Sequence, residues 1–117
     1  MTRIRKRKAE RGRTLLSKAR LDRLVEEAIV DCYNESEQLM GLYAMIEDKL
    51  ALPFETTVLG VSVIVERVDL TQREEIVAVC RRAGARQAIP IIDLHLPSPR
   101  PAGAEWIDAY RYWLGGE

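Results

Sequence analysis

Hydrophobic residues in the first half of the chain recur at helical spacing. Between residues 21 and 50 an apolar side chain returns every three or four positions, which is the period of one helix face. The pattern predicts one long helix over residues 18–50. Pro53 ends it, because the residue before a proline avoids the helical region. Three residues inside the helix weaken it and make a break the alternative: Asn34, Ser36 and Gly41.

After Pro53 the pattern changes to the alternation of β-strands. Four short segments rich in β-branched and small apolar residues follow: 54–59, 61–68, 76–80 and 86–89. Connections of hairpin length separate them, so we expect a small antiparallel barrel or a strongly bent sheet. Three aromatic residues at helical spacing then predict a short C-terminal helix over Glu105–Leu114: Trp106, Tyr110 and Trp113.

These elements define an α+β fold with three parts along the chain. Residues 1–17 form a basic arm that we expect to be mobile, residues 18–96 form the helix and barrel, and residues 97–117 form a Pro-rich spacer and the last helix, docked on the same domain. A length of 117 residues with 47% hydrophobic side chains is typical of one globular domain. No apolar run approaches the roughly 20 residues of a membrane helix. We therefore expect no membrane association.

Charge is distributed unevenly, although the net charge is zero. The first 23 residues carry ten basic and two acidic side chains, and the other 94 residues carry a charge of −8. The arm would attract a polyanion such as nucleic acid by releasing counterions from its phosphates; a tail that only aids solubility is the alternative. The candidate nucleic-acid contacts are Arg3, Arg5, Lys6, Arg7, Lys8, Arg11 and Arg13.

The centre of the predicted long helix is strongly acidic. Residues 26–38 hold five carboxylates and no basic side chain. On one helix Glu27, Asp31 and Glu35 would form a stripe of like charges that repel one another. A hard cation would convert that repulsion into binding, and calcium accepts six to eight oxygen ligands in tolerant geometry. The alternative is an acidic face that is merely solvated.

Other reactive residues give little support for catalysis. His95 has no histidine or cysteine neighbour at ligand spacing, and Cys32 and Cys80 lack zinc-binding spacing. We interpret both cysteines as reduced thiols of a cytoplasmic protein. No nucleophile, base and oxyanion donor come together in the pattern, so we do not expect an enzyme.

The acidic segment resembles the start of a known family. Residues 29–38 read Ile-Val-Asp-Cys-Tyr-Asn-Glu-Ser-Glu-Gln, and Ile-Glu-Asp-Lys-Leu at 46–50 and Pro-Phe at 53–54 follow. This order is similar to that of the small bacterial calcium-binding proteins of the CcbP type, over about residues 25–95. The resemblance implies an acidic helix leading into an SH3-like barrel, with Ca²⁺ as the bound ion. The implied ligands are Asp31, Glu35 and Glu37, with Glu27 and Asp48 as additions.

Three functions therefore stay open at this point. The acidic block favours a non-enzymatic calcium sensor or buffer. The arm favours a nucleic-acid or ribosome-associated small-barrel module, acting through residues 1–23. The third is a protein-interaction domain with an unknown partner, in which the acidic face has no specific ligand.

The arm generates the first prediction. Deleting residues 1–13 leaves the melting temperature nearly unchanged, because the segment has little apolar surface to bury. The same deletion weakens RNA binding and flattens its dependence on salt. Thermal unfolding and an RNA titration over a salt series measure the two effects. A deletion that unfolds the domain, or that leaves RNA binding unaltered, contradicts the prediction.

Overall fold

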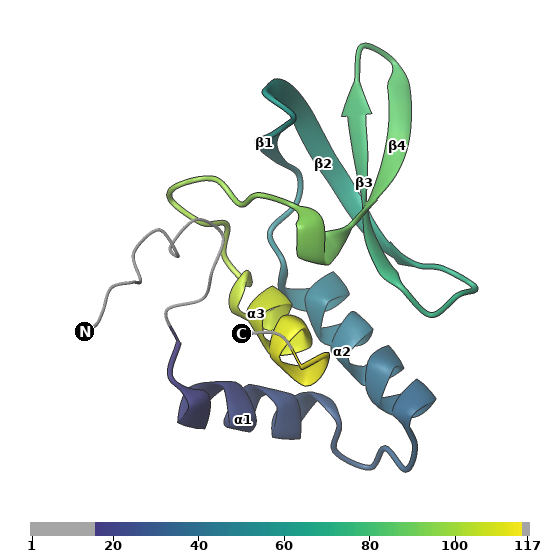
Figure 1. The fold of residues 1–117 in the computed structure, drawn as a ribbon, viewed down its shortest axis with the longest axis vertical. Helices are drawn as coiled ribbons and strands as arrows, with labels where there is room; N and C mark the ends of the chain where they lie inside the picture. The colour runs from purple at the N-terminus through teal and green to yellow at the C-terminus, as the bar shows by residue number, and fades with distance from the viewer. Residues whose placement is uncertain (1–15, 116–117) are drawn as a thin grey trace.

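The computed structural model describes residues 16–115, which form a group of helices beneath an antiparallel sheet (Figure 1). The helices are α1 (Lys18–Ala28), α2 (Glu35–Lys49) and α3 (Glu105–Trp113), and a short 3-10 turn, η2, spans Ile91–Asp93. The strands are β1 (Phe54–Val58), β2 (Val61–Leu70), β3 (Ile76–Arg82) and β4 (Ala85–Pro90). The mixed α+β class and the C-terminal helix are as predicted.

The predicted single N-terminal helix is wrong, and the break lies at the first of the three weak positions. α1 ends at Ala28, and Asn34 caps the start of α2 by accepting a hydrogen bond on Oδ1 from the Glu37 amide at 2.9 Å. Glu37 reaches back, and its Oε1 accepts a bond from the Tyr33 amide at 2.7 Å. The first bond satisfies an amide that a helix start otherwise leaves unpaired, and the second holds the residue before the cap. The chain therefore turns, and α2 folds back beside α1.

Gly41 serves the packing of these two helices. A Cβ atom placed on Gly41 would lie 2.3 Å from the carbonyl oxygen of Ala28 and 3.5 Å from Cys32 Sγ. Only glycine permits so close an approach of α2 to the end of α1. The residue that weakens the helix by propensity is thus required by its tertiary contact.

The sheet is open, so the closed SH3-like barrel is not formed by the described strands. The strands pair in the order β1-β2-β3-β4, and a register shift between Val65 and Arg67 bends the sheet. β1 and β4 remain at opposite edges. A side-chain bond ties the segment after β4 back toward β1: the buried Thr56 hydroxyl donates to the carbonyl oxygen of His95 at 2.6 Å.

α3 joins the helical layer to the core, as its aromatic spacing suggested. It packs against α1 and α2, with Trp106 and Tyr110 buried. Arg100 of the preceding spacer donates to both oxygens of Asp108 at 2.9 Å, and Asp108 is only 1% exposed. A buried carboxylate is costly unless it is paired in this way. The pair therefore fixes where the spacer meets α3.

The structure does not describe the basic N-terminal segment. The basic arm and its candidate nucleic-acid contacts lie outside the described residues. Cys32 and Cys80 are free thiols, and Cys80 is buried in β3. None of the helices between residues 16 and 115 has the length and apolar character needed to cross a membrane.

The contact at Gly41 generates the second prediction. Gly41→Ala lowers the free energy of unfolding, although alanine is the better helix former by about 1 kcal/mol. The added methyl group would overlap the Ala28 carbonyl oxygen and force α1 away from α2. Urea unfolding measures the change, with the exposed Ala44→Gly variant giving the propensity term alone. A Gly41→Ala variant as stable as wild type contradicts the close approach.

Candidate metal centre

The structure separates the five predicted calcium ligands. Asp31 lies in the turn between the helices, and Glu35 and Glu37 lie in the first turn of α2. Glu27 lies in the last turn of α1. Asp48 lies thirteen residues beyond Glu35 near the other end of α2, about 20 Å along the helix axis. The stripe of carboxylates on one helix therefore does not exist, and Asp48 does not share an ion with Glu35.

Some of the acidic residues at the start of α2 are favourable there even without a bound metal. The amide groups at a helix N-terminus carry partial positive charge, which favours carboxylates there. Glu35 and Glu37 occupy this turn, and the Glu37 carboxylate is engaged in the cap. The same positive charge opposes a cation, so a bound ion here needs enough carboxylates to outweigh it.

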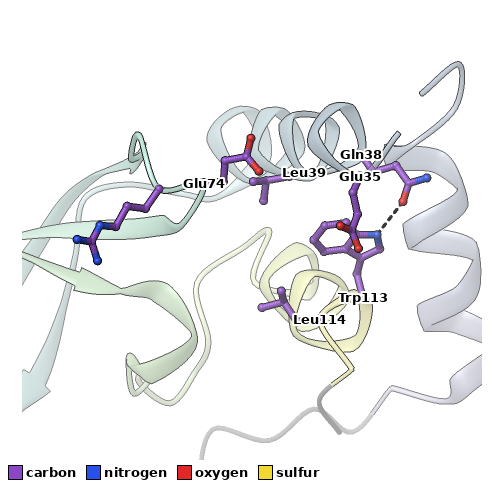
Figure 2. A pocket seen from close by; sticks show the side chains of 7 residues that line it. Glu35, Gln38, Leu39, Glu74, Trp113 and Leu114 are labelled. Carbon is purple, nitrogen blue, oxygen red and sulfur yellow. Dashed lines mark hydrogen bonds between the residues drawn. The ribbon is translucent and has the colours of Figure 1, made fainter. Parts of the chain in front are cut away.

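A hollow of about 360 Å³ opens beside the start of α2, where three elements meet. α2 contributes Glu35, Gln38 and Leu39, and the other walls are the loop between β2 and β3 and the end of α3. Figure 2 shows Glu35, Gln38 and Trp113 toward one end of the hollow and Glu74 toward the other. Two carboxylates far apart in sequence thus line the same space.

Glu74 is the member of this group that sequence reasoning missed. It follows the turn after β2, where nothing in the local pattern relates it to the acidic helix. Its Oε2 accepts a hydrogen bond from the Ser36 hydroxyl at 2.7 Å, and its backbone has a positive φ of 62°. The loop is held further by the Glu74 amide, which donates to the Thr71 carbonyl at 2.9 Å. Ser36 therefore connects the start of α2 to the hairpin.

Trp113 closes the hollow from the side of α3. Its indole N–H donates to Gln38 Oε1 at 2.9 Å, as the dashed line in Figure 2 shows. A change in the position of Gln38 or Glu35 would alter the surroundings of the indole ring. Trp113 is therefore placed to report on events at this end of α2.

Negative charge continues along α2 toward the sheet. Tyr43 donates to Glu47 Oε2 at 3.2 Å and to the Val68 carbonyl at 3.4 Å. Burial raises the pKa of Tyr43, and the carboxylates of Glu47 and Asp69 raise it further. Tyr43 thus connects α2 to β2 beside the carboxylates of Glu47 and Asp69.

The oxygen donors that line the hollow are of the type that a hard cation prefers, although they do not converge on one point. Carboxylate, amide and hydroxyl oxygens come from Glu35, Glu74, Gln38 and Ser36, and these are ligands that calcium prefers. Arg73 adds one positive charge to the wall. Within residues 16–115 no three His, Cys, Asp or Glu side chains converge as a metal site. The residues therefore fit calcium in type, and binding requires side-chain movement.

Comparison with known proteins identifies the family. The model of a family described as calcium binding, CcbP, matches residues 22–114. No curated protein and no solved structure matches the chain. The matched stretch begins within α1 and ends at the residue after α3, so it covers most of α1 and all the other helices and strands named above. The chain belongs to the CcbP family of calcium-binding proteins, and Ca²⁺ is the ion that this membership implies.

Proposed function

We propose that the protein binds Ca²⁺ at the start of α2 through Asp31, Glu35 and Glu37, with Glu74 as a further ligand. One observation carries the proposal: Glu35 and Glu74, from different elements, line one hollow. Glu37 lies in the same first turn of α2 as Glu35, and Asp31 lies four residues before Glu35 in the turn between the helices. Four carboxylates at this point outweigh the partial positive charge of the helix start.

The proposed site favours calcium over magnesium. Its donors come from a turn, a helix and a hairpin loop, and they include side chains of different length. Calcium tolerates such irregular ligation, whereas magnesium requires compact octahedral geometry and releases its water reluctantly. Glu27 and Asp48 lie outside this site, so either residue could bind calcium only as a ligand of a second ion.

The placement of these ligands supports a sensor more than a buffer. An ion held by both Glu35 and Glu74 would draw the β2–β3 loop toward α2, next to the indole of Trp113. Recruitment of Glu37 would compete with its hydrogen bond to the Tyr33 amide. Loss of that bond would alter the turn between α1 and α2, where Val30 and Tyr33 are exposed.

Calcium binding generates the third prediction. At a concentration one hundred times Kd, Ca²⁺ stabilises the native form by about 2.7 kcal/mol, which raises the melting temperature by roughly 10 °C. The double variant Asp31→Asn and Glu35→Gln loses this rise. In chelator it stays within about 1 kcal/mol of wild type, because the relieved repulsion offsets the lost helix-dipole interaction. Thermal unfolding in calcium and in chelator measures both effects.

Matched variants separate the ligand role from the structural role. Glu37→Gln keeps an oxygen for the cap but removes a charge, so it weakens calcium binding without melting the start of α2. Glu27→Gln with Asp48→Asn removes two charges outside the site and keeps the calcium-dependent rise. Trp113 fluorescence follows binding in the wild type, and Trp113→Phe removes that signal. If millimolar Ca²⁺ leaves the wild-type melting temperature unchanged, the acidic residues are a solvated face.

A further inference from the structure

The sheet has a groove at the end far from the helices. The pairing of β2 with β3 stops at Ile64 and Arg81, and beyond this pair the two hairpin tips diverge (Figure 1). A hollow of about 340 Å³ lies between the tips. Its apolar wall includes Val58, Leu59, Val61, Val63 and Ile89. An opening of this size accepts one or two apolar side chains of a partner.

Leu59 indicates that this groove is more than a consequence of the fold. It lies at the tip of the β1–β2 hairpin, is 98% exposed and has a positive φ of 52°. Gly60 follows with a φ of 78°, as in the hairpin turns that favour Asn-Gly. Leucine is unfavourable there both for its backbone and for its exposure. Nothing in the fold requires a large apolar side chain at this position.

The rim of the groove is positively charged. Arg82 and Arg86 line it, and no lining residue is acidic. Arg86 Nε lies 2.8 Å from Glu66 Oε1, and Arg81 shares the same carboxylate. Arg82 makes no ion pair with any residue in the described part of the chain. The rim therefore retains positive charge that can attract an anionic partner.

The groove chemistry distinguishes between anionic partners. Proteins that bind single-stranded nucleic acid use aromatic side chains on which the bases stack. The lining residues include no aromatic side chain, and their apolar members are aliphatic. An aliphatic floor with an arginine rim is complementary to a peptide that carries carboxylates beside apolar side chains.

We propose that the groove between the hairpin tips binds an acidic segment of a partner protein, which inserts an apolar side chain against Val61, Val63 and Ile89. Carboxylates of that segment pair with Arg82 and Arg86. The site lies on hairpins that contribute nothing to the hollow at the start of α2. This inference is therefore independent of calcium binding.

Fluorescence anisotropy with the full chain tests the proposal. The probes are labelled decapeptides in which Glu alternates with Leu, Val, Ile or Phe, and matched peptides in which Lys replaces Glu. At least one acidic peptide binds saturably below 1 mM, and its lysine counterpart does not. Arg82→Glu weakens that binding at least tenfold. Failure of every acidic peptide, or equal binding of the lysine series, overturns the proposal.

Two variants separate binding from folding. Leu59→Asn gives the turn the residue that it favours, so it raises the melting temperature while weakening the peptide at least fivefold. Arg20→Glu is the charge control, because it makes the same charge change as Arg82→Glu at a distant position. Arg20 is exposed in the first turn of α1, where Ser17 caps the helix. This variant leaves peptide affinity within twofold of wild type. Equal losses in the Arg20 and Arg82 variants would assign the effect to net charge and overturn the site.

Two other occupants are measured in the same series. A labelled poly-U oligonucleotide that binds and loses affinity in Arg82→Glu would make the groove a nucleic-acid site. Sedimentation that shows self-association of the wild type, abolished by Leu59→Asn, would make it a contact between two copies of this chain. Either result overturns the partner-protein assignment.

Discussion

The hydrogen bonds at the start of α2, in which Asn34 accepts from the Glu37 amide and Glu37 accepts from the Tyr33 amide, set the arrangement of the helices. They end the first helical run, reverse the chain and set α2 beside α1 at the distance that Gly41 permits. α3 then packs against both helices, where Tyr112 donates to Asp22 at 2.6 Å and Trp113 donates to Gln38 at 2.9 Å. Without the turn, the acidic residues would lie along one rod, far from the hairpin loop.

The elements could be predicted from the sequence, and the way they meet could not. Alternation and short runs of β-branched and small apolar residues located the four strands, and aromatic spacing located α3. Apolar periodicity continues across the break, so it could not distinguish one helix from two; the side chain of Asn34 decided the outcome by competing for backbone amides. Sheet closure depends on long-range pairing between the first and last strands. The link that does form is a hydroxyl-to-carbonyl bond of Thr56, which has no local signature.

For the candidate site, too, the sequence predicts the residues but not how they meet in space. The acidic residues around Glu35 stand out in the sequence, and the family match implies Ca²⁺ as the bound ion. Glu74 is found only in three dimensions, because its tie to Ser36 spans 38 positions. The start of α2 and the hairpin tips therefore carry opposite charge. Carboxylates surround the start of α2, whereas the hairpin tips combine aliphatic side chains with Arg82 and Arg86.

A calcium titration of the ¹⁵N-labelled full chain, followed by amide chemical shifts, tests whether the ion binds at the start of α2. We expect saturable shifts in residues 30–39 and 71–75 and in the indole N–H of Trp113, with little change in the hairpin tips. Magnesium at the same concentration should produce smaller shifts. Shifts confined to the end of α1 or to the region of Asp48, or no saturable shifts at all, would contradict a calcium site at the start of α2.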